Sequence, residues 1–188
     1  MKSMCISAMV AGFLVWGSFP AFADFTGPYD VANWTASTER GGSIDLSGAP
    51  TSITLTSGDD GSGVPSNQDF TIAAVAQSIV RFAWDYETFD LFADPFFDPF
   101  GFLRNGTFLQ LTDDNGPITQ SGVGEFLVMS GDVFGFRASS FDSDFGPAVT
   151  TISEFSVSTV PEPSTLLLLT SGLAGIIGYR VWKGAARV

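Results

Sequence analysis

The stretch Ser78-Ile-Val-Arg-Phe-Ala-Trp-Asp-Tyr86 determines the class of fold that this chain can adopt. Large apolar side chains occupy every second position from Val80 to Tyr86, and the polar residues Arg81 and Asp85 lie between them. A period of two places alternate side chains on opposite faces of a β-strand. We therefore expect a strand whose aromatic row packs in a core and whose charged side chains face solvent.

The same pattern continues on both sides of this strand, from Asp24 to Thr159. Short alternating runs rich in Phe, Val, Ile and Thr are separated by Gly, Pro, Asn, Asp and Ser, and no convincing helix is present. Asn105-Gly106 between two apolar runs predicts a tight hairpin, because both turn positions require positive φ. The pattern predicts an all-β fold, an antiparallel β-sandwich of the jelly-roll type. The other expected strands are 52–56, 69–76, 100–104, 107–111, 122–130, 132–138 and 148–158.

The N-terminus has the features of a Sec-type signal peptide over residues 1–23. Lys2 gives it a positive start, an apolar run follows, and Ala21 and Ala23 form an Ala-x-Ala cleavage site. We expect the Sec translocon to export the chain and signal peptidase to cut after Ala23. Residues 24–159 would then form a single β-sandwich domain, which is long enough to bury a core of its own.

The C-terminal segment, residues 160–188, has three parts in a fixed order. It opens with a proline-rich motif that the fixed φ of proline keeps out of helix and sheet. An uncharged apolar run follows, from which we expect a single transmembrane helix over about residues 164–182. Three basic side chains at its end would stay in the cytoplasm and leave the preceding chain outside. The motif is Val160, Pro161, Glu162 and Pro163, and the basic residues are Arg180, Lys183 and Arg187.

This order of motif, span and basic tail resembles the PEP-CTERM sorting signal of secreted proteins from Gram-negative bacteria that make extracellular polysaccharide. The resemblance implies recognition by an exosortase, a membrane-embedded cysteine protease or transpeptidase that is thought to cut near the Pro-Glu-Pro motif. It also implies a precursor anchored in the inner membrane and a mature protein at the cell surface or outside the cell. A plain anchor, which would make the chain a permanently anchored single-pass membrane protein, stays open as the alternative.

The predicted mature domain is strongly acidic, with 19 acidic side chains against four arginines and no lysine. Such a surface repels nucleic acid and anionic lipid, which excludes nucleic-acid binding. The chain has no histidine, and its one cysteine, Cys5, lies in the signal peptide. Imidazole bases, thiol nucleophiles and the common zinc ligands are therefore missing from the mature form. A pair of carboxylates could still hydrolyse glycosides, but we expect a non-enzymatic protein.

Two acidic segments with aromatic neighbours form the candidate metal site. Calcium binds six to eight oxygens from carboxylates, carbonyls and water, and both segments lie where strands end and loops begin. Their outline, an acidic pair near Tyr86 and a late Phe-Asp-Ser-Asp, faintly resembles the calcium edge of CUB-type jelly-roll domains, whose disulfides this chain lacks. The alternative is solvated charge beside hydrophobic turns. The candidate calcium ligands are Asp85, Glu87, Asp90, Asp94, Asp98, Asp142 and Asp144.

Five phenylalanines within residues 85–100 are unusual for a loop. They either pack beneath it or form an exposed patch for a partner or for sugar stacking, and we expect packing. Together with the tail, the sequence predicts a secreted, non-enzymatic surface or exopolysaccharide-matrix protein. The alternative is a calcium-dependent carbohydrate-binding or adhesion module. The five phenylalanines are Phe89, Phe92, Phe96, Phe97 and Phe100.

Overall fold

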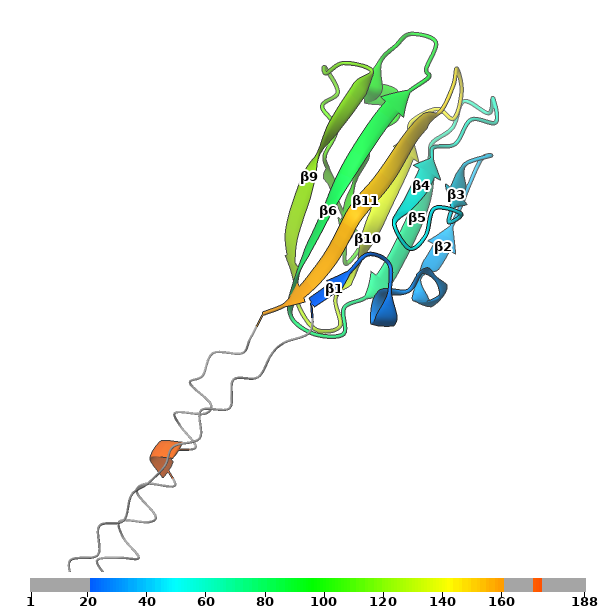
Figure 1. Ribbon diagram of the computed structural model, residues 1–188. Coiled ribbons are helices and arrows are strands. Elements are labelled where there is room, and N and C mark those ends of the chain that lie inside the picture. Colours follow the sequence, from blue (N-terminus) through cyan, green and yellow to red (C-terminus); the bar gives the residue numbers. More distant parts are fainter. Residues whose placement is uncertain (1–20, 161–170, 174–188) are drawn as a thin grey trace, which may run out of the picture.

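The computed structural model describes residues 21–160 and 171–173 of the chain, and its strands form two antiparallel sheets that pack face to face (Figure 1). One sheet has the order β3-β4-β11-β6-β9, with β1 also pairing with β11, and the other has the order β2-β5-β10-β7-β8. This topology confirms the predicted antiparallel β-sandwich. The elements are β1 (Ala21–Ala23), η1 (Gly27–Tyr29), η2 (Val31–Asn33), β2 (Thr35–Ser37), β3 (Ser43–Asp45), β4 (Ser52–Thr56), β5 (Ser66–Ala73), β6 (Ser78–Thr88), η3 (Pro95–Phe97), β7 (Phe100–Arg104), β8 (Thr107–Gln110), β9 (Thr119–Val128), β10 (Val133–Ser140) and β11 (Ala148–Thr159).

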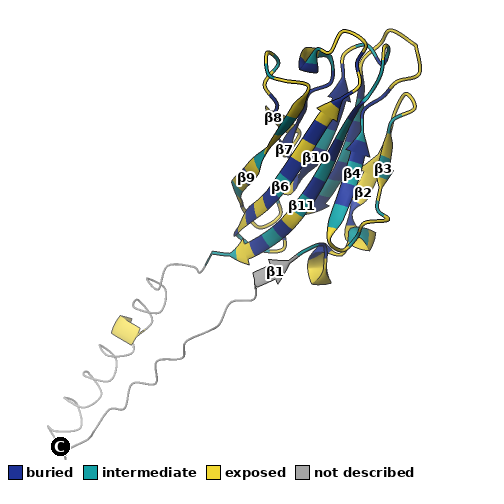
Figure 2. Ribbon diagram, turned by 45° about the horizontal axis from the view of Figure 1, so that its top comes forward, coloured by how far each residue is buried: buried dark blue, intermediate teal, exposed yellow. Residues whose placement is uncertain are grey.

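Strand β6 contains the stretch from which the fold was predicted, and it lies between β11 and β9. Buried side chains alternate with more exposed ones along its whole length (Figure 2), and Val80 and Phe82 are fully buried. Gly124 of β9 faces the ring of Phe82, where an added Cβ would lie 2.5 Å from Cζ. The strand prediction is confirmed, and a glycine on the neighbouring strand provides room for the aromatic row.

The core between the two sheets is built mainly from aromatic rings. Phe102 of β7 stacks on Phe126 of β9 with ring centroids 4.2 Å apart, and Trp34 stacks on Phe70 of β5 at 4.7 Å. Full burial of one such side chain stabilises the folded state by roughly 1.5–3 kcal/mol. The core cluster runs from Phe25 to Val157, so residues 21–160 contain a core of their own.

The Asn-Gly hairpin between β7 and β8 forms as predicted. Asn105 has a φ of 51° and Gly106 a φ of 78°, and Arg104 pairs with Thr107 across the turn. The Asn105 side chain donates to Asp132 Oδ1 at 2.8 Å and accepts from the Val133 backbone N–H at 2.9 Å. These bonds tie the hairpin to the turn between β9 and β10.

Residues 21–23, which belong to the signal peptide predicted from the sequence, form the short strand β1. They pair with residues 156–158 of β11, and the Asp24 N–H donates to the Phe155 carbonyl at 2.6 Å. Strand β4 pairs with residues 149–153 of β11, on the edge that does not face β6. Cleavage after Ala23 stays a prediction, and it would remove the partner of β11 at residues 156–158.

The C-terminal part of the chain is described only in fragments. The Val160 N–H donates to the Gln77 carbonyl at 2.9 Å, and residues 171–173 are helical. Within the described ranges, no helix is long and apolar enough to cross a membrane. The rest of the predicted span lies outside the described residues, as do Pro161, Glu162, Pro163, Arg180, Lys183 and Arg187.

One end of the sandwich holds the points where the chain enters and leaves it, and the other end holds two loops. Ser78 pairs with Thr159 at one end of the β6–β11 ladder, and Thr88 pairs with Ala148 at the other. The chain enters and leaves the sandwich at the first end (Figure 1). We call the other end, with the loops 89–99 and 141–147, the distal end.

Candidate functional site

The seven candidate calcium ligands fall into two groups. Two lie on the outward face of β6 and are exposed, and five lie in the two loops of the distal end. Within the second group, two side chains are buried and three are half-buried. The outward pair is Asp85 and Glu87, the buried pair is Asp90 and Asp98, and the half-buried three are Asp94, Asp142 and Asp144.

The three half-buried carboxylates take part in local turns. Asp94 accepts from the Phe96 N–H at 3.0 Å, Asp142 from the Asp144 N–H at 3.2 Å, and Asp144 from the Phe145 N–H at 2.9 Å. No three His, Cys, Asp or Glu side chains in residues 21–160 and 171–173 are placed to hold one metal ion. The structure therefore does not gather the seven candidates into one site, and calcium binding stays a prediction.

Asp90 and Asp98 are buried carboxylates with incomplete hydrogen bonding. Asp98 is 1% exposed, and its Oδ1 accepts from the Ser57 hydroxyl at 2.7 Å. Asp90 is 5% exposed, and its Oδ1 accepts from the Phe92 N–H at 2.7 Å. The Oδ2 atom of each carboxylate is buried and has no partner at normal hydrogen-bonding geometry. Most buried polar atoms in proteins do have a partner, so each of these two calls for an explanation.

The electrostatic surroundings of both carboxylates disfavour ionisation. Burial, together with the smaller effect of the charges of Asp90 and Asp142, raises the pKa of Asp98 to about 7 against the opposing effect of the Ser57 and Ser140 hydroxyls. Burial also raises the pKa of Asp90, with a smaller contribution from Asp142. The ion pairs among the described residues, Arg40–Asp60 and Arg137–Asp69, involve neither of them. The distal end thus holds two buried carboxylates that form no ion pair with an arginine among the described residues.

Two neutral oxygens in the same part of the core also lack partners. The Tyr86 hydroxyl and Thr150 Oγ1 are buried and unpaired, and their residues face each other across the β6–β11 ladder. Burial raises the pKa of Tyr86, and the nearby charges of Asp98 and Asp90 add to this effect. The distal end of the core therefore holds two unpaired hydroxyls, each able to donate and to accept, besides the two unpaired carboxylate oxygens.

A groove of about 490 Å³ lies on the outward face of the sheet, over β11, β6 and β9. Two rows of paired residues cross these three strands. Val149, Glu87 and Thr119 form one row, and Thr151, Asp85 and Ser121 form the other. The outward pair of predicted calcium ligands thus lies at the centre of a groove flanked by hydroxyl groups. The remaining lining residues are Tyr86, Phe89 and Gln120.

Phenylalanines surround the distal end, and the expectation that all five would pack is wrong for three. Phe100 is fully buried and Phe97 half-buried, but Phe89, Phe92 and Phe96 are exposed. Phe89 is 56% exposed and lines the groove. The other two contact rings of the loop 141–147. The ring centroids of Phe92 and Phe145 lie 5.3 Å apart, and those of Phe96 and Phe141 lie 5.1 Å apart.

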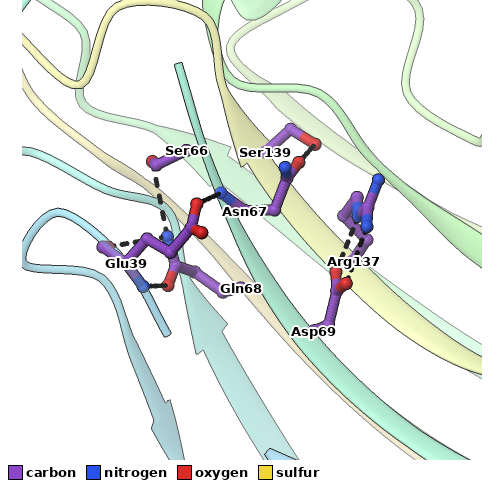
Figure 3. Close-up of polar contacts among 7 residues, drawn as sticks. All are labelled: Glu39, Ser66, Asn67, Gln68, Asp69, Arg137 and Ser139. Carbon is purple, nitrogen blue, oxygen red and sulfur yellow. Dashed lines mark hydrogen bonds and ion pairs between the residues drawn. The ribbon is translucent and has the colours of Figure 1, made fainter. Parts of the chain in front are cut away.

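The second sheet carries a polar network that sequence reasoning missed (Figure 3). Gln68 of β5 is completely buried, donates to the Glu39 carbonyl at 3.0 Å and accepts from the Glu39 N–H at 2.7 Å. On the other face of β5, Asp69 binds the Arg137 guanidinium through two bonds of 2.6 Å. These partners lie 29 and 68 positions apart in the sequence. Ser66-Asn67-Gln68-Asp69 is a continuous polar run, so no local pattern marked Gln68 as a buried side chain.

Comparison with known families identifies the C-terminal segment. Residues 159–181 match the family described as the PEP-CTERM protein-sorting motif. The resemblance inferred from the Pro-Glu-Pro strip, the apolar run and the basic end is thereby confirmed for this part of the chain. The sequence matches no curated protein.

Several solved structures resemble the sandwich at low identity. A family 35 carbohydrate binding module from Clostridium thermocellum is 11% identical, with a TM-score of 0.38 over 75% of this chain and 99% of its own. The family 11 module of the cellulase Lic26A-Cel5E from the same organism is 10% identical, with a TM-score of 0.39 over 78% and 97%. TmCBM61, solved in complex with β-1,4-galactotriose, is 8% identical, with a TM-score of 0.32 over 68% and 88%. These scores are too low to carry a functional inference, and the sandwich assignment rests on the strand pairing.

Proposed function

We propose that the chain is an exported, non-catalytic protein of the cell surface or exopolysaccharide matrix, whose sandwich binds a neutral polysaccharide in the groove over β11, β6 and β9. The observation that carries the binding proposal is the lining of this groove. It combines two exposed carboxylates and three hydroxyls with one exposed aromatic ring. The sorting motif at residues 159–181 supports the location.

Each type of lining group has a use in sugar recognition. The carboxylates of Asp85 and Glu87 can accept hydrogen bonds from neighbouring sugar hydroxyls, and charge-assisted bonds of this kind are the stronger ones. The hydroxyls of Thr119, Ser121 and Thr151 can both donate and accept. The Phe89 ring offers an apolar surface for the C–H face of a pyranose. Because the acidic lining repels anions, a neutral polymer fits the groove better than a uronic-acid polymer.

The surroundings of the outward pair favour binding over turnover. A glycosidase requires one carboxylic acid that stays protonated, which proteins achieve by placing it in an apolar pocket. Asp85 and Glu87 are both exposed on the open face of a sheet. The absence of histidine from the chain also removes the commonest alternative acid or base.

Binding can be tested by affinity electrophoresis of residues 21–160 in gels that contain soluble glucans, xylans, mannans or galactans. At least one neutral polymer should retard the protein without being hydrolysed. Glu87→Gln should weaken that interaction about tenfold or more, because a charge-assisted bond is lost. Glu125→Gln is the matched control, since Glu125 is exposed on β9 but does not line the groove. Equal retardation of both variants would contradict the proposed groove, and release of sugar would contradict the non-catalytic assignment.

Sorting by an exosortase is tested at the C-terminus of the native protein. β11 ends at Thr159, next to the predicted Val160–Pro163 motif, so cutting near the motif would release the sandwich whole. Mass spectrometry in cells with and without an exosortase should show a shortened or modified C-terminus only when the enzyme is present. A chain that still ends at Val188 in exosortase-positive cells would support the permanent anchor instead.

A further inference from the structure

We propose that residues 21–23 cover the strand that leads into the sorting motif, and that an exosortase cuts the chain efficiently only after signal peptidase has removed them. The inference deepens the proposed function, because it rests on sorting by an exosortase and on the predicted cleavage after Ala23. It adds an order to the two cuts and names the contact that imposes this order.

The first ground is where the two ends of the domain lie. Ala21 pairs with Ser158 and Ala23 pairs with Ser156, so β1 runs antiparallel to the last part of β11. Strand β11 ends at Thr159, and the predicted motif follows directly in the sequence. The chain therefore enters and leaves the sandwich at one end, with the two segments side by side (Figure 1). The residue before the first predicted cut thus lies next to the strand that precedes the second.

Strand β1 makes the end of β11 an interior strand. On its other edge, β11 pairs with β6 through Thr159, and the Val160 N–H then donates to the Gln77 carbonyl at 2.9 Å. Strand β4 pairs with residues 149–153, and among the described residues no strand other than β1 and β6 pairs with residues 156–158. Removal of residues 1–23 would turn this part of β11 into an edge strand with free backbone N–H and carbonyl groups.

The predicted cleavage point separates this cover from the core. Immediately after it, the Asp24 N–H donates to the Phe155 carbonyl and the Phe25 N–H donates to the Pro50 carbonyl at 3.0 Å. The Phe25 ring is buried and stacks on Phe155 with centroids 4.6 Å apart. These contacts hold the start of the mature chain in place with or without β1. Cleavage after Ala23 would therefore uncover residues 156–158 without disturbing the packing beside them.

Pairing on both edges slows a cut near the motif through the population of open states. The active site of a protease holds residues on both sides of the bond that it cuts, so the residues before the motif must leave the sheet or offer a free edge. Cutting of a folded segment follows how often that segment opens. Each backbone hydrogen bond changes the open population about two- to tenfold. A chain that retains β1 should therefore be sorted about tenfold more slowly than a chain without it.

The order is tested with a chain that keeps β1 after its signal peptide has gone. A heterologous Sec signal peptide replaces residues 1–20 and is cut before Ala21. Ala23→Val blocks the native site, which requires a small residue, and keeps a strand-forming side chain. In exosortase-positive cells, pulse–chase labelling and mass spectrometry should show that the C-terminal cut is about tenfold slower than in the wild type.

The matched control adds Phe22→Pro to the same chain. It keeps the length and the N-terminus but removes the backbone N–H in the middle of β1, so it should be cut at the wild-type rate. The cover is wrong if the chain that retains β1 is cut as fast as the wild type, or if the proline control is equally slow. A wild-type chain that is never cut would instead overturn sorting by an exosortase, and the cover with it.

Hydrogen exchange tests the cover without the enzyme. In purified residues 21–160, the N–H groups of residues 156–158 on the β1 edge should exchange about tenfold more slowly than in residues 24–160. Residues 149–153 are the internal control, because β4 and β6 pair with them in both proteins. Equal exchange at residues 156–158 in the two proteins would overturn the cover, whatever the fate of the sorting motif in cells.

Discussion

Two regions of the sandwich hold buried or half-buried polar side chains and satisfy them in opposite ways. The first region is the polar network of the second sheet, around Gln68 and Asp69 of β5. There the backbone of Glu39 bonds to the Gln68 amide, and Arg137 bonds to the Asp69 carboxylate (Figure 3). At the distal end, Asp90 and Asp98 are buried with one unpaired oxygen each.

The difference shows that burial alone does not decide what a polar group contributes. A buried group with complete hydrogen bonding stabilises the fold modestly, while the same group without a partner costs its full desolvation. Removing a polar group should therefore destabilise the network and relieve the distal end. The predictions below test this difference in the sign of the change in stability.

The largest effect is expected at Gln68. Gln68→Ala would leave the Glu39 N–H without its acceptor and open a cavity where the amide packs against Gly42, while the Glu39 carbonyl would keep only its bond from the Gly42 N–H. We expect a loss of roughly 2–4 kcal/mol in the free energy of unfolding, measured by urea denaturation of residues 21–160. Asn67→Ala is the control, because the neighbouring side chain is only half-buried and accepts one side-chain bond, from Ser139. A loss at Gln68 no larger than at Asn67 would mean that the network does not hold the β5 edge.

The next effect is a pH dependence of the distal end. Because the pKa of Asp98 rises from 3.8 to about 7 on folding, the folded state holds a proton that the unfolded chain releases between these values. Stability should fall as pH rises through this window, by roughly 2–4 kcal/mol, and level off above it. The charged groups that face Asp98 are Asp90 and Asp142.

This dependence is measured by urea unfolding at pH 4.5 and 7.5 in EDTA. Asp98→Asn should flatten the profile, because asparagine does not titrate. A wild-type domain that becomes more stable from pH 4.5 to 7.5 would show that carboxylates with lowered pKa values, such as Asp132, outweigh the buried one.

A smaller effect is expected at Asp69. Its bond to Arg137 is bidentate but partly exposed, so Asp69→Asn should cost only about 1 kcal/mol, and less in high salt. Asp60→Asn is the control, because its ion pair with Arg40 is longer, at 3.8 Å, and more exposed. The measurement is urea unfolding at low and at high NaCl. Equal losses at both positions would place the Asp69 pair among ordinary surface ion pairs.

The parts of this comparison differ in how far they could be predicted from the sequence. The alternation at Ser78–Tyr86 and the Asn105-Gly106 turn are local signals, and both predict the observed structure. In the network, Gln68 bonds to a residue 29 positions away and Asp69 to one 68 positions away. No local sequence pattern encodes contacts over such separations. The three-residue strands β2 and β3 are too short to show a period.

The distal end was predicted in composition but not in geometry. The sequence indicated seven acidic candidates, and only the folded loops show that two of them are buried. One local signal was available, because Asp98 lies within Phe96-Phe-Asp-Pro-Phe100 and an acid among apolar neighbours tends to be buried with them. The exposure of Phe89, Phe92 and Phe96 could not be inferred, because it depends on how the loop 89–99 closes against residues 141–147.

The smallest expected effects come from removing one hydroxyl in each region. The resulting changes in stability should differ in sign, so this pair of substitutions tests the comparison most directly. Tyr86→Phe removes a buried hydroxyl that has no partner at the distal end, so stability should stay unchanged or rise by up to about 1 kcal/mol. Ser139→Ala removes a hydroxyl that donates to Asn67 at 2.9 Å in the network, so stability should fall by about 0.5–1.5 kcal/mol. Both are measured by urea unfolding in EDTA at pH 7.5. If Tyr86→Phe costs as much as Ser139→Ala, the hydroxyl of Tyr86 has a partner, and the distal end is as fully satisfied as the network.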